Sequence, residues 1–464
     1  MARHLFGTDG IRGTPGVAPL DEATLIAIGE ALGSHLRKKQ PRPRILIGMD
    51  PRLSSPQLAQ QIACGAAAAG AEIAFAGVIS TPGVACLVRL KGFSAGVVIS
   101  ASHNPFTDNG VKLFSGSGTK FSDEVELELE REIVARRAAT GAAPGSSPEV
   151  APEVARKVAQ RVALEADTSL DEQYLAWLRG FALPGAKLEG MKLVLDCANG
   201  AASALGPQLF RSLGAQVMAI NAEPDGRNIN VDCGSLYPES LRKQVVDSHA
   251  ALGVAFDGDA DRAIFSSGMG RIVDGDGVML AAARHMKAAG TLKGDVVVGT
   301  TMSNLGLERV LASEGIRLVR AAVGDRYVLE EMLRLGANLG GEQSGHVIFL
   351  DDSVTGDGLL TALIIASLVS MKGPLEMLTS GLSVYPQKIL NVRVKEKPPL
   401  EGLPGVAWAL AEANRTLGNR GRIVLRYSGT ESLARVMVEA EQQDDVERFT
   451  ESIAAAIRAA IGAF

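Results

Sequence analysis

The sequence predicts an α/β protein, because apolar, strand-like runs alternate with helix-like segments through most of its 464 residues. The runs RILIGMD (44–50), AEIAFAGV (71–78) and AGVVIS (95–100) are separated by helical stretches near 55–70 and 83–91. This alternation is typical of largely parallel sheets, in which ligands bind beyond the carboxyl ends of the strands. Polar residues that directly follow apolar strands are therefore the candidate functional residues.

The same alternation continues beyond the middle of the chain. KLVLDCANG (192–200) precedes a helix expected at 203–213, and ALGVAFDGD (251–259) and DVVVGTT (295–301) are further apolar strands that end in polar residues. The strands RIVLRYS and ARVMVEAE, followed by a helix near 443–461, predict a small α+β domain at the end. Length alone predicts about three domains, at roughly 150 residues each.

Composition excludes several classes of protein. The net charge of −5 gives no overall basic field that would attract nucleic acid. The four cysteines form no Cys-x-x-Cys pair, which suits a reducing cytosol. The first residues lack the apolar core of a signal peptide, and the apolar run 359–371 is shorter than the roughly 20 residues that a bilayer requires. We expect a cytoplasmic protein with no membrane partner, in which 359–371 is a buried helix.

Two changes in composition indicate domain boundaries. Residues 136–166 are rich in Ala, Pro and Ser and then charged, which is typical of a linker or a surface excursion. Residues 372–386 carry turn signals before the final strands and helix begin.

The first candidate site follows the strand VVIS. Ser102, His103 and Asn104 occupy the turn after this strand, and Pro105 forces a non-helical exit from it. Lys112 follows ten residues after Ser102, on a strand that we expect to return. Ser102 can act as a nucleophile if a base lies nearby. Alternatively, these residues form an ordinary turn that hydrogen-bonds its own backbone.

The second candidate site is AFDGDADR, residues 255–262. Asp257, Asp259 and Asp261 recur at every second position after an apolar strand. Three carboxylates this close repel one another, and a bound Mg²⁺ is the simplest relief. Arg262 adds a ligand for phosphate beside the metal. The Asp-Gly-Asp at 274–276 is interpreted as a turn.

The third candidate site is GGEQSGH, residues 340–346. Glu342, Ser344 and His346 alternate along an expected extended loop, and alternation would place all three on one face. Carboxylate, hydroxyl and imidazole groups suit the hydroxyls of a sugar. A plain hairpin loop explains the spacing equally well.

The fourth candidate site is RYSGTES, residues 426–432, with an arginine just beyond. A guanidinium fork, hydroxyls and backbone N–H groups in a tight turn form a nest for an anion such as a phosphate monoester. The groups concerned are Arg426, Ser428, Gly429, Thr430 and Arg435. The alternative is a Ser-Gly turn beside a surface arginine.

The fifth candidate site is LFGTDGIRG, residues 5–13. Thr8, Asp9 and Arg12 lie among three glycines, and Arg12 could reach a phosphate. The alternative is an N-terminal turn that covers the first domain.

Together, these motifs resemble the α-D-phosphohexomutase superfamily. They occur in that family's order: Ser-His-Asn-Pro, Asp-Gly-Asp-x-Asp-Arg, Gly-Glu-x-Ser-Gly-His and Arg-x-Ser-Gly-Thr-Glu. The N-terminal FGTDGIRG, the segments TTMSNLGLERVL and VGDRYVLEEM, and Gln343 are similar to the phosphoglucosamine mutase branch in particular. Ser432 departs from the pattern, since relatives usually have proline there.

The resemblance implies four domains around a central cleft, three α/β domains with mixed sheets and a small α+β domain. The expected ranges are 1–155 with the phosphoserine loop, 156–254, 255–373 with the metal and sugar loops, and 374–464 with the phosphate clamp. It also implies roles for individual residues. Ser102 would carry the phosphoryl group and bind the metal through it.

The remaining implied roles fall into four groups. The transferred phosphoryl group would be surrounded by Arg12, His103, Lys112 and Arg262. One Mg²⁺ would be bound by Asp257, Asp259 and Asp261. The sugar would be bound by Glu342, Ser344 and His346, and the other phosphate by Arg426, Ser428, Gly429, Thr430 and Arg435. Lys112 or His103 would be the general base.

The implied activity is an intramolecular phosphotransferase, an isomerase, that interconverts glucosamine 6-phosphate and glucosamine 1-phosphate. Glucosamine 1,6-bisphosphate would be the intermediate or activator, and the product would feed amino-sugar nucleotide and cell-wall precursor synthesis. The expected partners are a phosphosugar substrate and a kinase or bisphosphate donor for Ser102, with a homodimer left open. Alternatives are a phosphomannomutase/phosphoglucomutase, a metal-dependent phosphatase and a non-catalytic phosphosugar-binding protein.

Overall fold

The computed structural model describes residues 5–7, 9–139, 162–428 and 432–463. The chain divides into two compact units. The larger unit comprises Met1–Gly294 and Val323–Ser380, and the smaller comprises Asp295–Ala322 and Gly381–Phe464.

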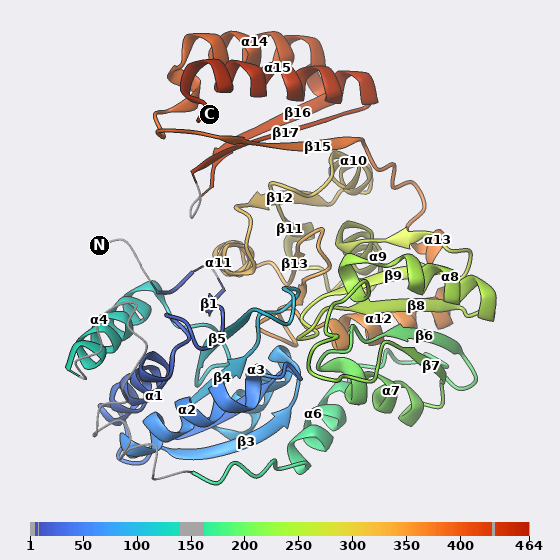
Figure 1. The fold of residues 1–464 in the computed structure, drawn as a ribbon. Helices are drawn as coiled ribbons and strands as arrows, with labels where there is room; N and C mark the ends of the chain where they lie inside the picture. The colour runs from blue at the N-terminus through green and yellow to red at the C-terminus, as the bar shows by residue number, and fades with distance from the viewer. Residues whose placement is uncertain (1–4, 8, 140–161, 429–431, 464) are drawn as a thin grey trace. The chain divides into compact units, whose positions relative to one another are not determined.

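The larger unit begins with a five-stranded sheet in the order β1-β5-β4-β2-β3 (Figure 1). Its elements are β1 (Ile11–Gly13), α1 (Glu22–Arg37), β2 (Arg44–Met49), α2 (Ser55–Ala68), β3 (Glu72–Val78), α3 (Thr81–Lys91), β4 (Ala95–Ile99), β5 (Asn109–Ser115) and α4 (Asp123–Ala139).

A second five-stranded sheet follows, in the order β10-β9-β8-β6-β7. Its elements are α6 (Ser169–Arg179), β6 (Lys192–Asp196), α7 (Ala202–Ser212), β7 (Gln216–Ile220), the 3₁₀ turn η1 (Gly234–Leu236), α8 (Glu239–Ser248), β8 (Leu252–Phe256), β9 (Ala263–Ser267), β10 (Ile272–Val273) and α9 (Gly275–Ala288). The larger unit ends with α11 (Asp325–Leu335), β13 (Leu339–Gly341), β14 (Val347–Phe349), α12 (Gly358–Lys372) and α13 (Leu375–Leu378).

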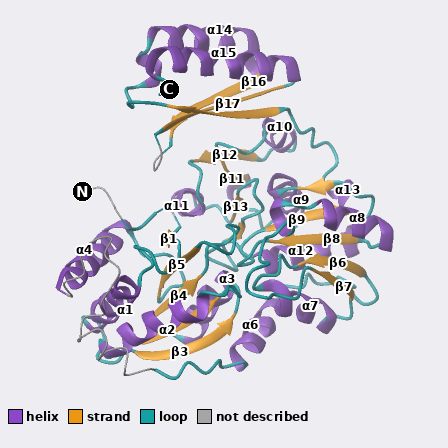
Figure 2. Cartoon of the chain, viewed as in Figure 1, coloured by secondary structure: helices purple, strands orange, loops and turns teal. Residues whose placement is uncertain are grey.

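The smaller unit contains a parallel strand pair and a three-stranded antiparallel sheet in the order β15-β17-β16. Its elements are β11 (Val296–Thr300), α10 (Leu305–Ser313), β12 (Arg317–Ala321), β15 (Gln387–Arg393), η3 (Leu400–Gly402), α14 (Pro404–Leu417), η4 (Gly418–Arg420), β16 (Gly421–Tyr427), β17 (Leu433–Ala440) and α15 (Gln443–Ile461). Helices α14 and α15 lie together on one face of the three-stranded sheet (Figure 2). The predicted α+β tail is confirmed.

The two large sheets are mixed, as the family resemblance implies, and not largely parallel, as the alternation of strands and helices alone predicts. β2 runs parallel to β3 and β4, whereas β5 is antiparallel to both β4 and β1. Likewise β6 is parallel to β7 and β8, and β9 is antiparallel to β8. A parallel neighbour requires a crossover, but the chain after β4 and after β8 turns straight back. These two reversals are the loops that carry Ser102 and the three aspartates.

The predicted boundary between residues 254 and 255 needs correction. It falls inside β8, which continues to Phe256 and pairs with β9. The aspartate loop therefore belongs to the second sheet and not to a third domain. The predicted boundary between 155 and 156 lies outside the described residues.

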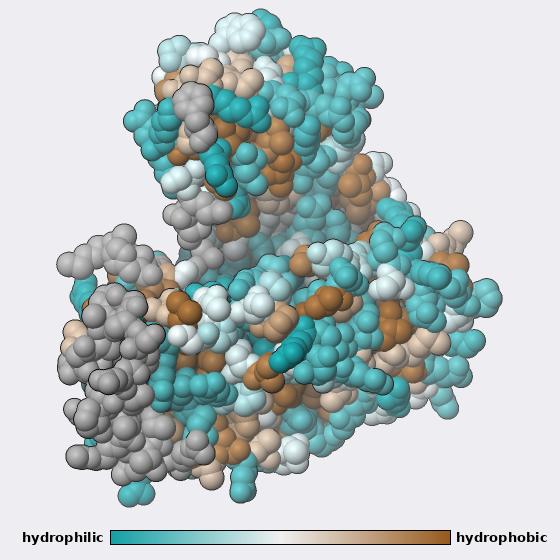
Figure 3. All heavy atoms as spheres, viewed as in Figure 1, coloured by the Kyte–Doolittle hydropathy of each residue, from teal (hydrophilic) through white to brown (hydrophobic). Residues whose placement is uncertain are grey.

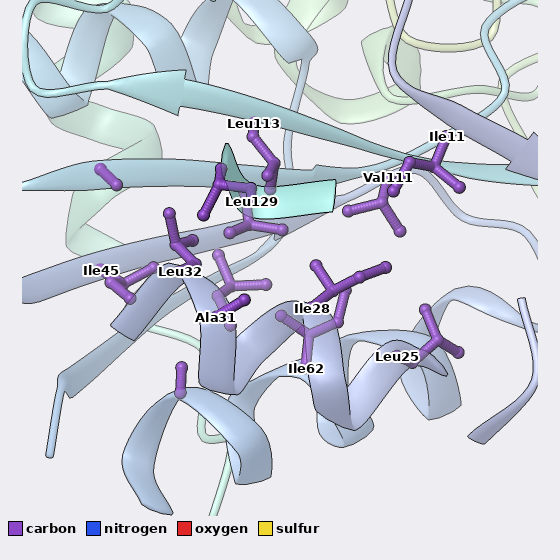
Figure 4. Packing of buried hydrophobic residues seen from close by; sticks show 14 of the residues in the cluster. Ile11, Leu25, Ile28, Ala31, Leu32, Ile45, Ile62, Val111, Leu113 and Leu129 are labelled. Atoms are coloured by element: carbon purple, nitrogen blue, oxygen red, sulfur yellow. The ribbon is translucent and has the colours of Figure 1, made fainter. Parts of the chain in front are cut away.

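The core of the first domain lies between its sheet and helices α1 and α2 (Figure 4). Leu25, Ile28 and Leu32 project from α1 toward Ile62 of α2 and Val111 of β5. All five side chains are buried, and each fully buried side chain of this size contributes about 1.5–3 kcal/mol through the hydrophobic effect.

Two glycines let α1 and α2 pack with their backbones in contact. A Cβ atom at Gly29 would lie 2.1 Å from the Ile62 carbonyl oxygen, and one at Gly65 would lie 2.1 Å from that of Ile26. Any side chain at either position would force these helices apart.

Helix α12 confirms the predicted buried helix at 359–371, since the side chains from Gly358 to Val369 are buried. In the described part of the chain, no helix combines the length and the apolar character needed to cross a membrane. On the face of the larger unit drawn in Figure 3, hydrophilic side chains predominate and hydrophobic ones are scattered among them.

The buried N-cap of α12 predicts a pH-dependent stability. Asp357 accepts hydrogen bonds from the Leu360 N–H and from the Tyr174 hydroxyl, and burial raises the pKa of its carboxyl to about 6. An unfolded aspartate titrates near pH 4, so the folded state holds the proton more tightly between about pH 4 and 6. This group's contribution to stability is therefore full below pH 4 and is lost as the pH rises through 6, a change of about 3 kcal/mol.

We expect Asp357→Asn to remove this pH dependence. The free energy of unfolding of the wild type should fall by about 2–3 kcal/mol relative to the variant between pH 4 and pH 7. Urea unfolding can be followed by the fluorescence of Trp177, which stacks on Tyr174, in a Trp408→Phe background. Parallel pH profiles for the two proteins would contradict the assignment.

Candidate active site

Ser102 lies in a strained turn at the carboxyl end of β4. Its φ of 51° places it in the left-handed region, which costs a non-glycine residue of order 1–3 kcal/mol and is concentrated at functional sites. The side chain is buried, and its Oγ donates a hydrogen bond of 2.5 Å to Oδ2 of Asp257. Nδ1 of His103 lies 3.2 Å from the same Oγ. The structure thus joins the first candidate site to the second.

The three aspartates form a buried cluster that fits a hard cation. One carboxylate oxygen from each of Asp257, Asp259 and Asp261 lies within 4.8 Å of the others. Oδ1 of Asp259 and Oδ1 of Asp261 are buried, and no described residue hydrogen-bonds to either oxygen. Burial and the two neighbouring carboxylates raise the pKa of Asp257 well above its usual value. The donor set fits Mg²⁺, which prefers carboxylate oxygens.

Lys112 lies beside this cluster, on the returning strand that the sequence predicts. It stands opposite Val98 in the β4–β5 register, and its Nζ lies 2.8 Å from Asp259 and 3.0 Å from Asp9. Burial lowers the pKa of Lys112, but these carboxylates outweigh burial and raise it well above its usual value. In this arrangement Lys112 is a cation.

Two arginines add positive charge around Ser102. Arg12 donates to the side-chain oxygen of Asn104 at 3.2 Å and pairs with Asp9. The Nε atoms of Arg12 and Arg262 are buried, and neither has a hydrogen-bond partner among the residues described. Burial, with Arg262 and Arg12, lowers the pKa of His103 to about 4, so its ring is neutral near pH 7. Nε donors without a hydrogen-bond partner suit the oxygens of a phosphoryl group.

The loop between β13 and β14 holds the residues predicted to bind sugar. Oε1 of Glu342 accepts the Gly324 N–H at 2.9 Å, which fixes one oxygen of this carboxylate. The Ser344 hydroxyl is buried and has no hydrogen-bond partner in the described part of the chain. An unused buried hydroxyl beside a fixed carboxylate suits recognition of a polyhydroxylated ligand.

His346 lies elsewhere than the predicted alternation places it. Its ring is buried; Nε2 accepts the Gly356 N–H at 3.1 Å and Nδ1 lies 3.7 Å from Asp261. Burial lowers the pKa of His346, but Asp261 outweighs burial and raises it to about 9. The Gly356 N–H nevertheless needs the lone pair of Nε2, so we assign a single proton to Nδ1. Both nitrogens are engaged, which favours orienting Asp261 over binding sugar.

The predicted phosphate clamp lies in the smaller unit. Arg426 of β16 stands directly opposite Arg435 of β17, and burial together with Arg435 lowers the pKa of Arg426. Like charges in opposed positions destabilise a strand pair, and a bound anion would relieve them. Lys397, which the sequence reasoning missed, donates to the Ser428 carbonyl at 2.8 Å. Gly429, Thr430 and also Thr8 lie outside the described residues.

Sequence reasoning also missed Thr81, which contacts the aspartate cluster, and Lys120, which pairs with Asp9 and Asp325. The Thr81 hydroxyl donates to Oδ2 of Asp259, and Nζ of Lys120 bridges Asp9 at 2.8 Å and Asp325 at 2.7 Å. Thr81 also follows an apolar strand, β3, after two residues, which is the one signal that could have identified it. The predicted turn at 274–276 is instead the start of α9: Asp274 caps the helix by accepting the N–H groups of Asp276 and Gly277, and Asp276 lies in its first turn.

Comparison with known proteins agrees with this geometry. Four family models, each for a domain of "Phosphoglucomutase/phosphomannomutase", match the chain in order. They are alpha/beta/alpha domain I at 3–139, domain II at 172–270, domain III at 274–385 and the C-terminal domain at 389–456. The chain belongs to the phosphoglucomutase/phosphomannomutase family. The family match confirms four domains, three α/β and one small C-terminal domain.

Within the phosphoglucomutase/phosphomannomutase family, similar curated relatives share one name. "Phosphoglucosamine mutase" from Solibacter usitatus is 51% identical, and the alignment covers 100% of both chains. "Phosphoglucosamine mutase" from Koribacter versatilis is 49% identical, over 99% of this chain and 98% of that one.

Two solved structures of the phosphoglucomutase/phosphomannomutase fold are similar over nearly the whole chain. A family protein from Burkholderia thailandensis aligns with a TM-score of 0.77 at 24% identity, covering 98% of this chain and 97% of that one. N-acetylphosphoglucosamine mutase from Aspergillus fumigatus, in complex with GlcNAc-6P and magnesium, aligns with a TM-score of 0.62 at 18% identity, covering 98% and 96%. At these identities the structures support the fold alone.

Proposed function

We propose that this chain is a reversible mutase that interconverts glucosamine 6-phosphate and glucosamine 1-phosphate. The observation that carries the proposal is the buried Ser102 hydroxyl, held 2.5 Å from Asp257 of the aspartate cluster. A nucleophile beside a cation site, with two arginine Nε donors that lack a hydrogen-bond partner among the described residues, suits phosphoryl transfer. The full-length relatives named phosphoglucosamine mutase support the choice of sugar.

In the proposed reaction, Ser102 begins as a phosphoserine. Its phosphoryl group passes to the free O1 hydroxyl of glucosamine 6-phosphate: the bond from phosphorus to the serine oxygen breaks and the bond to O1 forms. The product is glucosamine 1,6-bisphosphate, which turns end over end and returns its O6 phosphoryl group to Ser102. Glucosamine 1-phosphate then leaves, and the enzyme is phosphorylated again.

The charges in the site suit this transfer. A phosphoserine carries a charge of about −1.5 to −2, which repels an incoming hydroxyl oxygen. Arg12 and Arg262 have buried Nε donors without partners, so they can bind the phosphoryl oxygens without giving up an existing hydrogen bond. One Mg²⁺ per chain, held by Asp257, Asp259 and Asp261, would neutralise part of the remaining negative charge.

The hydroxyl proton requires an acceptor. His103 is neutral, and its Nδ1 lies 3.2 Å from Oγ of Ser102. Lys112 is the other candidate base, and it must first give up a proton that the carboxylates around it stabilise. Both candidates remain part of the proposal.

The groups that do not react would hold the substrate. We assign the sugar hydroxyls to the second oxygen of Glu342 and to the Ser344 hydroxyl. We assign the unreactive phosphate to the paired guanidinium groups of Arg426 and Arg435. Because either phosphate of the bisphosphate can occupy this clamp, the clamp must bind the phosphate group and not the sugar. A homodimer, and a kinase or bisphosphate donor for the first phosphorylation, remain predictions.

A substrate comparison tests the choice of sugar. We expect kcat/KM for glucosamine 6-phosphate to exceed the values for glucose and mannose 6-phosphates by about 10–100-fold, since a hydrogen bond to a charged amino group contributes about 1.5–3 kcal/mol. Coupled assays with each sugar, on the Mg²⁺-loaded enzyme, measure the three values. A preference for mannose or glucose would favour a phosphomannomutase/phosphoglucomutase, and net release of inorganic phosphate would favour a phosphatase.

A further inference from the structure

Besides Asp257, the second domain contributes the side chain of Asn230 to the serine loop of the first domain. Asn230 follows β7, and its Nδ2 donates to the carbonyl oxygens of Ser102 at 2.9 Å and Asn104 at 3.0 Å. The residue is only 9% exposed. An amide nitrogen has two protons, so each carbonyl can receive one of them.

The same two carbonyls are held from within the first domain. Nη2 of Arg52 donates to the carbonyls of Ser102 and Asn104, at 2.8 Å in both cases. Arg52 is fully buried, and its charge is paired with Asp50. The carbonyl of the candidate nucleophile and the carbonyl two residues after it therefore each receive two donors, one from each domain.

The aspartate loop packs against the Ser102 carbonyl and the Asn230 side chain. A Cβ atom at Gly258 would lie 2.5 Å from the Ser102 carbonyl oxygen and 2.9 Å from Nδ2 of Asn230. Gly258 separates Asp257 from Asp259, so the backbone of the aspartate loop touches both the serine and the asparagine. Any displacement of the Ser102 carbonyl would move the serine relative to these carboxylates.

The backbone of Asn230 is also held in place, and its conformation points the side-chain amide at the two carbonyls. Its φ is 60°, in the left-handed region, and its N–H donates to the Ala198 carbonyl at 2.9 Å. Asparagine and aspartate tolerate this conformation better than other non-glycine residues. The chain thus places an asparagine, a residue that tolerates the left-handed conformation, against the carbonyl of Ser102, which is itself left-handed. The hydrogen bond to Ala198 holds this asparagine in place.

We propose that Asn230 is a positioning residue for phosphoryl transfer. It holds the left-handed backbone of Ser102 so that Oγ faces the aspartate cluster, and it does so from the second domain, which also supplies Asp257 to the Ser102 hydroxyl. This inference rests on the proposed role of Ser102 as the phosphoryl carrier.

The variant Asn230→Asp tests the inference. It keeps the size and the left-handed tolerance of the side chain, but it replaces the donor by an oxygen that faces two carbonyl oxygens. We expect kcat for glucosamine 6-phosphate to fall about 10–100-fold, as for a displacement of roughly 1 Å of a reacting group, while KM changes by less than about threefold. Single-turnover transfer from phosphorylated enzyme to substrate should slow by the same factor as kcat.

Asn199→Asp is the matched control. Asn199 is also left-handed, 8% exposed and in the second domain, and its Nδ2 donates to a carbonyl, that of Asn228, outside the serine loop. We expect its kcat to stay within about threefold of the wild-type value. Asn230→Gly, which removes the amide without adding charge and permits the same φ, should lower kcat about tenfold.

Three outcomes would overturn the inference: normal transfer by Asn230→Asp, equal losses in the two aspartate variants, or a loss of Asn230→Asp activity that appears wholly in KM. Thermal melting of each variant shows whether it folds, and Asn230→Gly carries the test if the aspartate variant does not. Ser102→Ala, assayed in parallel, separates the two claims. An active Ser102→Ala enzyme would refute the proposed function, whereas an inactive one beside an active Asn230→Asp enzyme would refute only the role of Asn230.

Discussion

Ser102→Ala is expected to lower turnover of glucosamine 6-phosphate by at least about 10⁴-fold, because removing a covalent nucleophile removes the reaction path itself. The neighbouring Ser100 cannot replace it. The Ser100 hydroxyl donates to Asp50 at 2.7 Å and accepts the N–H of Ser102, so it is held away from the aspartate cluster. Steady-state assays and mass spectrometry for phosphate on residue 102 measure the effect.

A matched serine variant controls for the loss of a buried hydroxyl. Ser266 lies in β9 and is also fully buried, and its hydroxyl donates only to the adjacent Ser267 carbonyl among the hydrogen bonds described. We expect Ser266→Ala to retain activity within about threefold and to carry phosphate on Ser102. Retention of more than a tenth of wild-type turnover by Ser102→Ala would refute the phosphoserine mechanism.

The elements of the fold were predictable because their signals are local. Apolar runs such as the one ending at Ile99 form strands, and the polar residues after them lie at the ends of those strands. The direction of the next strand was not predictable from the same signal. Both β5 and β9 return antiparallel because their loops reverse the chain, and nothing in an apolar run encodes its neighbour's direction.

The predicted arrangement of the third motif failed for a local reason. Alternation places Glu342 and His346 on one face only if the segment is extended. Instead Gly345, at φ 94°, closes a tight turn in which its N–H donates to the Glu342 carbonyl and the Glu342 N–H donates to the His346 carbonyl. A glycine within an alternating pattern indicates such a turn, and this signal outweighs the alternation.

Asn230 and Arg52, which hold the backbone of the serine loop, could not be predicted because the residues they contact are distant in sequence. Asn230 meets a carbonyl 128 residues away, and Arg52 meets one 50 residues away. Both side chains contact backbone atoms, which every residue possesses, so no pairing of residue types reveals them. Groups that act on side chains or ligands, such as the three aspartates, leave a compositional signal; groups that hold a backbone do not.

The second large effect is expected at the aspartate cluster. Asp257→Asn preserves the shape of the side chain: its oxygen can still accept the Arg262 N–H, and its amide can donate to Oγ of Ser102. It removes one of three carboxylates available to a cation. We expect turnover to fall at least about 100-fold, since charge stabilisation by one preorganised group is worth this much. Chelation of Mg²⁺ from the wild type should abolish turnover, and added Mg²⁺ should restore it.

Stability should change in the opposite sense, because the metal-free cluster repels itself. In a chelator, Asp257→Asn should melt at or above the wild-type temperature, since burial and the neighbouring carboxylates disfavour a negative charge at this position. With Mg²⁺ at about 100 times its dissociation constant, the wild type should gain about 2.7 kcal/mol and the variant markedly less. Asp274→Asn is the control: it makes the same substitution at the cap of α9, where asparagine also caps, and it should respond to Mg²⁺ as the wild type does. Equal responses to Mg²⁺ in all three proteins would place the metal elsewhere.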